Sequence, residues 1–250
     1  MPYIKSVCKA GKTMEIEKYY TYRCGPAEGK RRKKVNRTSK MQQEINDRQA
    51  VKKLTRILNA NYDETSWYLT FSYAKDKRPD VETMKNHIRK LLSDMRKVFK
   101  QDGKELKYVE TAEVGERGAK HFHVVINNID IRKIAKLWPH GYVSAKPLDS
   151  SGQYRKLAEY FMKYYKKTRG TAEQLQKKAY NCSRNLERPE PQKRKIGSRR
   201  FKTEIIIPKG WYLDEETKRH GETADGYEYF CYTLIQCLEY TNSWYGAEKT

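Results

Sequence analysis

The sequence predicts a mixed α+β fold built on an antiparallel sheet, and three patterns carry this prediction. Residues 67–73 alternate large apolar side chains with polar ones, as a strand does when one face lies against a core. Between the capping residue Asp80 and Asp102, apolar residues recur three or four positions apart, which indicates a helix of about five turns. Residues 106–114 and 120–127 then read as two strands joined by a tight turn, so they should pair as an antiparallel hairpin.

The remaining elements follow from the same two periodicities, taken in chain order. They are a hairpin of strands 3–9 and 14–22, a helix over 39–58, a short helix over 131–138, a strand over 142–148 and a helix over 153–168. Residues 203–207 read as a further strand, whereas residues 227–240 fit either a pair of strands or a helix.

From residue 66 to residue 168 the order is therefore β-α-β-β-α-β, followed by one more helix. This order is that of the ferredoxin-like plan, an antiparallel sheet with two helices packed on one face. We expect three regions: a basic hairpin, arm and helix over 1–65, the compact domain over 66–169, and a DNA-contacting extension over 170–250. The plan by itself says little about function, because many unrelated activities share it.

The charge of the chain favours a polyanionic partner, most simply nucleic acid. Lys and Arg number 53 against 31 Asp and Glu, a formal net charge of +22 at pH 7. Arg31, Arg32 and Lys33 lie in a basic run that is either a solvated charge block or an arm that contacts DNA phosphates. No apolar run approaches the roughly 20 residues that span a bilayer, and residues 1–10 lack the apolar core of a signal peptide. Five cysteines in no zinc-binding spacing favour reduced thiols and a cytoplasmic location.

Two histidines on one strand form a candidate metal site. His121 and His123 are two residues apart, so their side chains share a face, where two neutral imidazoles can chelate a divalent cation. The alternative is two unrelated strand histidines. Across the predicted hairpin, Glu113 falls roughly opposite His123 and is the expected third ligand, unless it is simply a solvated strand residue. Glu110 and Glu116 are the fallback third ligands.

The last helix of the domain carries a tyrosine at the border between its apolar stripe and a basic ridge. At about 100° per residue, Leu157, Phe161 and Tyr165 face inward. The residues beside that stripe are Lys156, Tyr160, Lys163 and Lys167. A phenol at this border is held by packing on one side, while ammonium groups on the other favour phenolate and bind the phosphate that it attacks. Tyr160 is therefore the candidate nucleophile, and Tyr164 is either a second nucleophile or a core aromatic.

Three segments together resemble the three motifs of HUH endonucleases, in the rolling-circle replication initiators (Rep proteins) of small phages, bacterial plasmids and integrated elements. They are the strand Leu69–Tyr73, the segment His121-Phe122-His123 and the helical Tyr160-x-x-Lys163-Tyr164. Glu113-Val114-Gly115 is similar to the family's acidic residue followed by glycine, and the helix from Ala158 to Lys167 is similar to the phage-type tyrosine motif. The resemblance covers residues 66–168. Phe122 departs from the family pattern because it is not aliphatic, but its side chain would face away from the metal.

The resemblance implies an enzyme, dependent on Mg²⁺ or Mn²⁺, that nicks and joins single-stranded origin DNA at a stem-loop and forms a 5′-phosphotyrosine intermediate. The residues that would carry these roles are His121, His123 and Glu113 for the metal, Tyr160, Tyr164 and Lys163 for catalysis, and Lys156 and Lys167 for DNA contact. It also implies a bacterial host whose helicase and polymerase act with the protein.

Two other readings remain open. A transposase or a conjugative relaxase would use the same HUH chemistry in a different process. A non-catalytic ferredoxin-like protein would instead bind single-stranded nucleic acid by stacking bases on strand aromatics, without a metal and without a covalent adduct.

Overall fold

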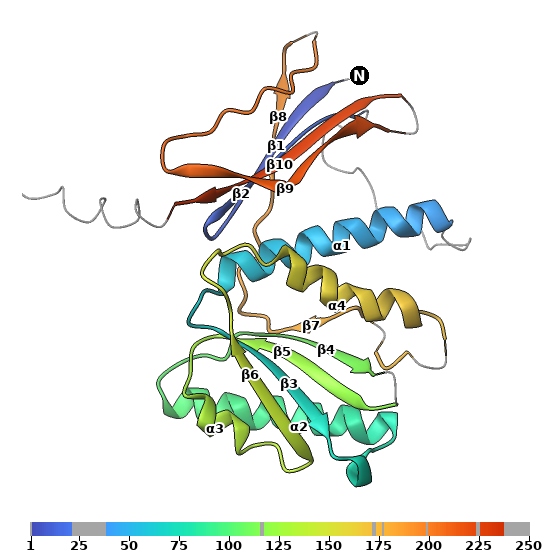
Figure 1. Ribbon diagram of the computed structural model, residues 1–250, viewed down its shortest axis with the longest axis vertical. Helices are drawn as coiled ribbons and strands as arrows, with labels where there is room; N and C mark the ends of the chain where they lie inside the picture. The colour runs from blue at the N-terminus through green and yellow to red at the C-terminus, as the bar shows by residue number, and fades with distance from the viewer. Residues whose placement is uncertain are drawn as a thin grey trace, which may run out of the picture. The chain divides into compact units, whose positions relative to one another are not determined.

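The computed structural model describes residues 2–21, 39–115, 118–171, 174–176, 178–198, 200–223 and 226–237 (Figure 1). The chain divides into two compact units. The central unit is Glu44–Arg188, and the terminal unit combines Met1–Gln43 with Pro189–Thr250. Each unit contains its own five-stranded sheet, which confirms the predicted α+β class with antiparallel sheets. No helix in the described part of the chain is both long enough and apolar enough to cross a membrane.

The sheet of the central unit places the histidine strand in its middle. Its strand order is β6 (Gly141–Pro147), β3 (Trp67–Tyr73), β5 (Lys120–Ile126), β4 (Tyr108–Val114) and β7 (Asn181–Cys182). Every neighbouring pair is antiparallel. The predicted strands are all present, with ends shifted by one or two residues. The two-residue strand β7 was not predicted, and it pairs with the start of β4.

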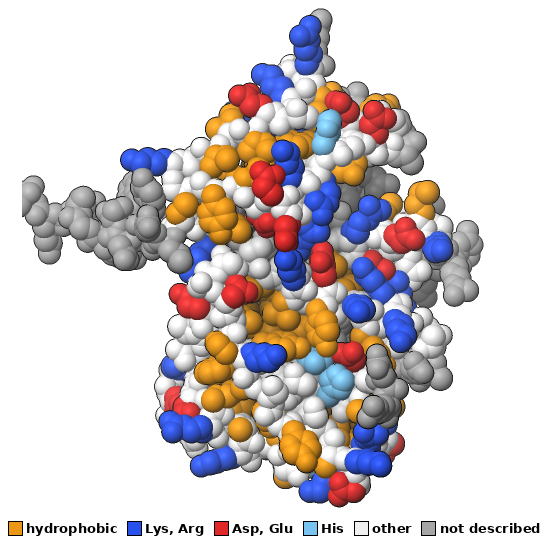
Figure 2. Space-filling model, viewed as in Figure 1, with side chains coloured by type: hydrophobic (Ala, Val, Ile, Leu, Met, Phe, Trp, Pro, Cys, Tyr) orange, Lys and Arg blue, Asp and Glu red, His pale blue; other side chains and the backbone are white. Residues whose placement is uncertain are grey.

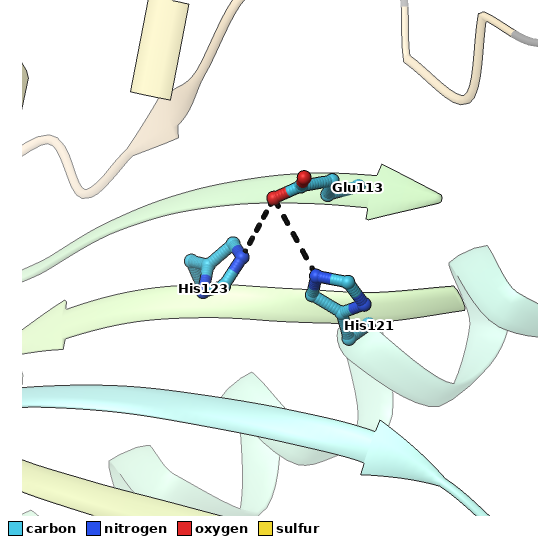
Figure 3. Close-up of side chains that lie close together, drawn as sticks. All are labelled: Glu113, His121 and His123. Atoms are coloured by element: carbon cyan, nitrogen blue, oxygen red, sulfur yellow. Dashed lines mark hydrogen bonds and ion pairs between the residues drawn. The ribbon is translucent and has the colours of Figure 1, made fainter. Parts of the chain in front are cut away.

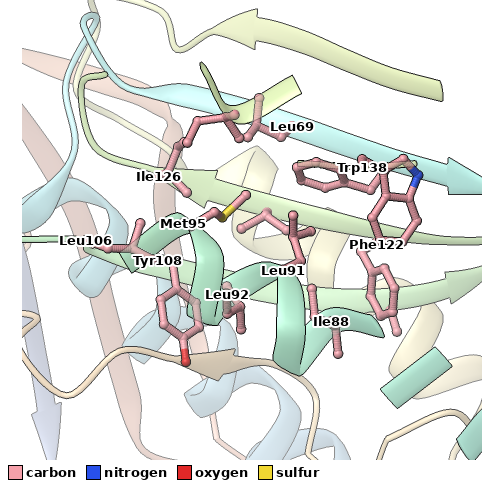
Figure 4. Packing of buried hydrophobic residues seen from close by; sticks show 14 of the residues in the cluster. Leu69, Ile88, Leu91, Leu92, Met95, Leu106, Tyr108, Phe122, Ile126 and Trp138 are labelled. Atoms are coloured by element: carbon pink, nitrogen blue, oxygen red, sulfur yellow. The ribbon is translucent and has the colours of Figure 1, made fainter. Parts of the chain in front are cut away.

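Two separate cores lie on the two faces of this sheet. Helices α2 (Val81–Gln101) and α3 (Ile131–Ala135) cover one face, where apolar side chains of alternate strand positions meet them (Figure 4). Helices α1 (Lys40–Asn61) and α4 (Arg155–Thr168) cover the opposite face. Each fully buried side chain of Leu or Phe size in these cores contributes about 1.5–3 kcal/mol to folding. The sequence predicted two helices on one face of the sheet, and α2 and α3 lie there. A second pair, α1 and α4, covers the opposite face.

Helix α2 begins and ends where its sequence predicts. The Asp80 carboxylate accepts hydrogen bonds from the backbone N–H groups of Glu82 and Thr83 at 2.8 and 2.9 Å. These bonds satisfy two of the donors that a helix start leaves unpaired. The helix stops before Gly103, whose φ of +67° is a left-handed conformation that glycine adopts without strain. Helix α3 is shorter than predicted, since Trp138 lies beyond its end, buried against the sheet, and donates to the Ser72 carbonyl at 3.0 Å.

Helix α4 is anchored to α1 near both of its ends. At the first end, the Tyr154 backbone N–H donates to Oδ1 of Asn59 at 2.9 Å. At the other end, the guanidinium of Arg169 makes two bonds to the Asp47 carboxylate, at 2.7 and 2.9 Å. Between these anchors Phe161 is 1% exposed. The helix is thus held in one position and rotation over the sheet.

The terminal unit combines strands from the first and last parts of the chain in one sheet. These two parts were predicted to form separate regions. Its strand order is β8 (Gln192–Ile196), β1 (Tyr3–Ala10), β2 (Thr13–Tyr20), β10 (Glu228–Gln236) and β9 (Trp211–Glu222). The predicted N-terminal hairpin is confirmed as β1 and β2. The open region 227–240 contains one strand, β10, as far as the structure describes it. Strands β8 and β9 were not predicted.

The predicted strand over residues 203–207 is wrong. These residues are in no strand, and two backbone carbonyls in and next to this segment accept hydrogen bonds from a side chain instead. The Lys18 ammonium donates to the carbonyls of Lys202 and Glu204 at 2.9 and 2.7 Å, so these carbonyls are occupied by an amine rather than a neighbouring strand. Phe201 and Ile205 pack against the sheet's apolar cluster, which accounts for the apolar pattern that favoured a strand.

Candidate metal and tyrosine site

Strands β4 and β5 bring Glu113, His121 and His123 onto the face of the sheet that α4 covers. Glu113 lies opposite His121, and Thr111 lies opposite His123. The predicted register, with Glu113 opposite His123, was therefore two residues out. The turn explains the shift in register. The Gly115 N–H donates to the Ala119 carbonyl at 2.7 Å, so the two strands pair closer to Gly115 than predicted. A slip of two residues keeps every side chain on its face, so the three groups still converge.

The three side chains form a compact set of possible metal ligands (Figure 3). Oε2 of Glu113 lies 2.9 Å from Nε2 of His123 and 3.4 Å from Nε2 of His121. One ligand atom from each residue lies within 4.8 Å of the others. The side chains of Glu113, His121 and His123 are 24%, 18% and 5% exposed, so the set opens to solvent on one side. Two imidazole nitrogens and one carboxylate oxygen suit a divalent cation that keeps further positions open for a substrate.

Hydrogen bonding sets His121 up as a ligand. Its Nδ1 lies 3.1 Å from the Ala119 carbonyl, which can only accept a hydrogen bond. The proton of the neutral ring therefore sits on Nδ1, and the lone pair of Nε2 points towards Glu113 and His123. This is the usual outer contact of a metal-bound histidine.

The electrostatics of His123 and Glu113 also suit metal binding. Burial, followed by the neighbouring His121, lowers the pKa of His123 to about 4. The ring is therefore neutral near pH 7, as a ligand must be. Burial alone would raise the pKa of Glu113, but hydrogen bonds from Tyr160 and His123 outweigh it and place that pKa below its usual value.

The fallback ligands do not join the set. Glu110 follows the alternate face of β4, opposite Val124, whose side chain packs in the core beneath α2. Glu110 is 4% exposed, and its carboxyl accepts a hydrogen bond from Asn181. It therefore points away from the histidines. Glu116 lies outside the described residues.

Helix α4 delivers the Tyr160 hydroxyl to this set. The hydroxyl donates to Oε2 of Glu113 at 2.8 Å and lies 3.0 Å from Nε2 of His123. Tyr160 is 40% exposed, so the phenol is open to a substrate. Burial, and then the bond to the Glu113 carboxylate, raise the pKa of Tyr160 above its ordinary value. This differs from the expectation that lysines would favour the phenolate, because the side chains that act on the hydroxyl are Glu113, His123 and Tyr68.

The other candidate residues of α4 lie around Tyr160. Tyr164 lines a small hollow with Thr111, the residue opposite His123. Tyr165 is half-buried against the core beneath α4, as predicted. The lysines predicted to contact a phosphate or DNA are exposed on this helix: Lys156, Lys163 and Lys167. Figure 2 shows histidine side chains at the surface of the central unit, with Lys and Arg side chains on the same face. Arg31, Arg32 and Lys33 lie outside the described residues.

Sequence reasoning missed two residues of β3 that contact His123. The Tyr68 hydroxyl lies 2.6 Å from Nδ1 of His123, and Oγ1 of Thr70 lies 3.1 Å from the same atom. The rings of Tyr68 and His123 are nearly parallel, 8° apart, with centroids 5.6 Å apart. The alternation on β3 does place Tyr68 and Thr70 on one polar face of that strand. Predicting their contact with His123 would also have required the pairing between β3 and β5.

A comparison with protein families gives a match, which lies in the region of the chain that contains the site. A family model described as replication-associated protein ORF2/G2P, a rolling-circle replication initiator family, matches residues 66–169. The matched segment runs from β3 to the end of α4 and contains every residue of the site. It covers less than half of the chain. No curated protein and no solved structure matches the chain.

Proposed function

We propose that the chain is a metal-dependent HUH endonuclease and strand transferase that nicks single-stranded origin DNA and initiates rolling-circle replication of a plasmid, phage or integrated element. One observation carries the proposal: the Tyr160 hydroxyl lies 2.8 Å from Glu113 and 3.0 Å from His123, so a phenol and a metal-ligand set meet at one point. The match to replication-associated proteins over residues 66–169 supports the same conclusion. The strand order β6-β3-β5-β4 agrees with a ferredoxin-like core.

Glu113, His121 and His123 would hold Mg²⁺ or Mn²⁺, which when bound would polarise an oxygen of the scissile phosphate. The chain prepares these ligands before any substrate arrives. His121 has its proton directed to the Ala119 carbonyl, and burial keeps His123 neutral. The carboxylate of Glu113 supplies the negative charge of the set.

Tyr160 would perform the covalent step. Its oxygen attacks the phosphorus, a bond between them forms, and the bond from phosphorus to the 3′ oxygen breaks. The phenol loses its proton and the departing 3′ oxygen gains one, so the products are a 5′-phosphotyrosine and a free 3′-OH. That 3′-OH would prime a host polymerase, while a host helicase separates the strands.

The exposed lysines of α4 would guide the DNA to the phenol. Lys163 follows Tyr160 by one turn and would stabilise charge on the phosphoryl oxygens. Lys156 and Lys167 would contact neighbouring phosphates, as would Arg31, Arg32 and Lys33 of the N-terminal region. Tyr164, one turn after Tyr160, would carry out the second transfer that rejoins a strand. We assign catalysis to residues 66–169 and DNA contact to the regions on either side.

The test is a covalent-adduct assay on the full chain. The protein is incubated with Mn²⁺ and a single-stranded stem-loop oligonucleotide from the origin of the element that encodes it, and a denaturant-resistant protein–DNA band is measured. Wild type should form the band, and Tyr160→Phe should not. The matched control is Tyr165→Phe, on the same helix but half-buried against the core, which should retain it.

Three outcomes would contradict parts of the proposal. Adduct formation by a His121→Ala, His123→Ala double variant would remove the metal site from the mechanism. Binding of the oligonucleotide with no adduct in any metal would favour a non-catalytic single-strand binder. Cleavage confined to a transposon end or a transfer origin would assign the same chemistry to a transposase or a relaxase.

A further inference from the structure

The two metal-ligand histidines are held by different kinds of partner. Nδ1 of His121 faces a backbone carbonyl, which fixes the ring proton on that nitrogen. Nδ1 of His123 faces two hydroxyls, those of Tyr68 at 2.6 Å and Thr70 at 3.1 Å. A hydroxyl both donates and accepts, so it does not fix the position of the proton. His123 can therefore carry its proton on either nitrogen.

The surroundings of Nε2, the other nitrogen of His123, favour a different position of the ring proton without a metal than with one. Nε2 lies 2.9 Å from the Glu113 carboxylate, a strong acceptor, so before a metal binds the proton is best placed there. A cation at Nε2 needs the lone pair of that nitrogen, and the proton must then be on Nδ1. His123 is only 4% exposed, so an Nδ1–H group without an acceptor would be costly.

We propose that Tyr68 is a positioning residue for metal loading, whose hydroxyl donates to Nδ1 of His123 before the metal binds and accepts from Nδ1–H afterwards. No proton is gained or lost overall, because the one that leaves Nε2 is replaced by one on Nδ1. The inference rests on the proposed function, since it takes His123 as a ligand. Tyr68 suits the role because its ring lies parallel to the imidazole and packs near Phe161, which keeps the hydroxyl at Nδ1.

Thr70 is the weaker partner of the same nitrogen. Its hydroxyl is farther from Nδ1 than that of Tyr68, at 3.1 Å against 2.6 Å. It can take over part of the role when Tyr68 lacks a hydroxyl. The largest effect is therefore expected from the double variant Tyr68→Phe, Thr70→Val, which leaves Nδ1 with neither hydroxyl.

The strand offers a closely matched control. Tyr73 lies on the same strand, and its hydroxyl also contacts an Nδ1 atom, that of His87 at 3.1 Å. Its side chain is buried in the core on the opposite face of the sheet, beneath α2. Tyr73→Phe thus removes a tyrosine–histidine hydrogen bond of the same kind without touching the ligand set.

The first measurement is Mn²⁺ binding to the full-length protein without DNA, by electron paramagnetic resonance of the free ion. Loss of an outer partner of a metal-bound histidine weakens metal binding by about 10–100-fold, so Tyr68→Phe should bind Mn²⁺ about 10-fold more weakly and the double variant more weakly still. Tyr73→Phe should bind as wild type does. Unchanged affinity in a Tyr68→Phe protein that still unfolds cooperatively overturns the inference.

The second measurement locates the proton by NMR of protein labelled with ¹⁵N-histidine. His123 should carry it on Nε2 without metal and on Nδ1 with saturating Mg²⁺. A proton on the same nitrogen in both states overturns the proposed exchange of roles at Tyr68.

Adduct formation then separates this inference from the proposed function. Tyr68→Phe should need more Mn²⁺ than wild type for half-maximal adduct formation, a shift in metal dependence that general damage to the fold would not produce. If wild type binds Mn²⁺ through His123 but forms no adduct, the proposed function fails, whereas the role of Tyr68 is still decided by binding and NMR. If the adduct forms and Tyr68→Phe shows no change in Mn²⁺ dependence, only the role of Tyr68 fails.

Discussion

Replacement of the buried Glu110 by Gln should remove a pH-dependent loss of stability. Glu110 accepts a hydrogen bond from Asn181 through one oxygen, and its other oxygen, Oε2, has no hydrogen-bond partner among the described residues. The charged form of this carboxyl is therefore poorly solvated. Burial raises the pKa of Glu110 from 4.5 to about 7.

The sign of the effect follows from proton binding. Below pH 4.5 both the folded and the unfolded chain hold the proton on Glu110, so folding is not penalised. As the pH rises towards 7, the unfolded chain releases that proton first, and stability is lost until the folded protein releases it too. The difference between a pKa of 4.5 and one of about 7 corresponds to about 3 kcal/mol of unfolding free energy lost by pH 9.

The assay is urea unfolding of wild type and Glu110→Gln at pH 5 and pH 9. Gln keeps an oxygen for Asn181 and cannot become charged. The advantage of the variant should therefore grow by about 2–3 kcal/mol between the two pH values. Protonation of His123 affects both proteins equally and cancels in the comparison. Glu105→Gln, at an exposed carboxylate before the same strand, is the control. An equal difference at both pH values would refute the reasoning.

Three further changes test the support of the site and its contacts with DNA. Asp47→Asn breaks the two-bond pair with Arg169 and should lower the unfolding free energy by about 2 kcal/mol, measured by urea unfolding; no loss would mean that the pair does not anchor α4. Phe161→Ala should cost about 3–5 kcal/mol by the same measurement, and a loss below about 1 kcal/mol would contradict its place in the core. Affinity for single-stranded DNA should fall steeply with salt, and Lys156→Ala should reduce the slope of log affinity against log salt by about 1. Lys97→Ala, on α2, should leave that slope unchanged, and a flat salt response of the wild type would contradict phosphate contact.

The parts of the fold that were predicted correctly depend on short-range patterns. Helix α2 has its cap at Asp80, its apolar repeat and its glycine stop within one stretch of chain. The shared face of His121 and His123 needs only the two-residue period of a strand. By contrast, β8 and β9 are mostly polar and exposed, so their sequences lack the alternation that marks a half-buried strand.

The parts of the site that were not predicted depend on pairing between distant segments. The position of Glu113 opposite His121 is set by a hydrogen bond within the turn, which the pattern of either strand does not reveal. The contact between Tyr68 and His123 requires the register of β3 against β5. The neighbours of the Tyr160 hydroxyl require the rotation of α4, which its buried contacts and its anchors to α1 determine together.

The double anchoring of α4 has a consequence for how DNA would move during a reaction. The two bonds hold the backbone of the helix near both ends, so under the proposed function the DNA strand would have to come to Tyr160. A DNA end covalently bound to Tyr160 would likewise stay at the position that α4 gives this residue. For a later rejoining step, the free DNA end would have to return to Tyr160. The movement would therefore be made by the nucleic acid and not by the helix.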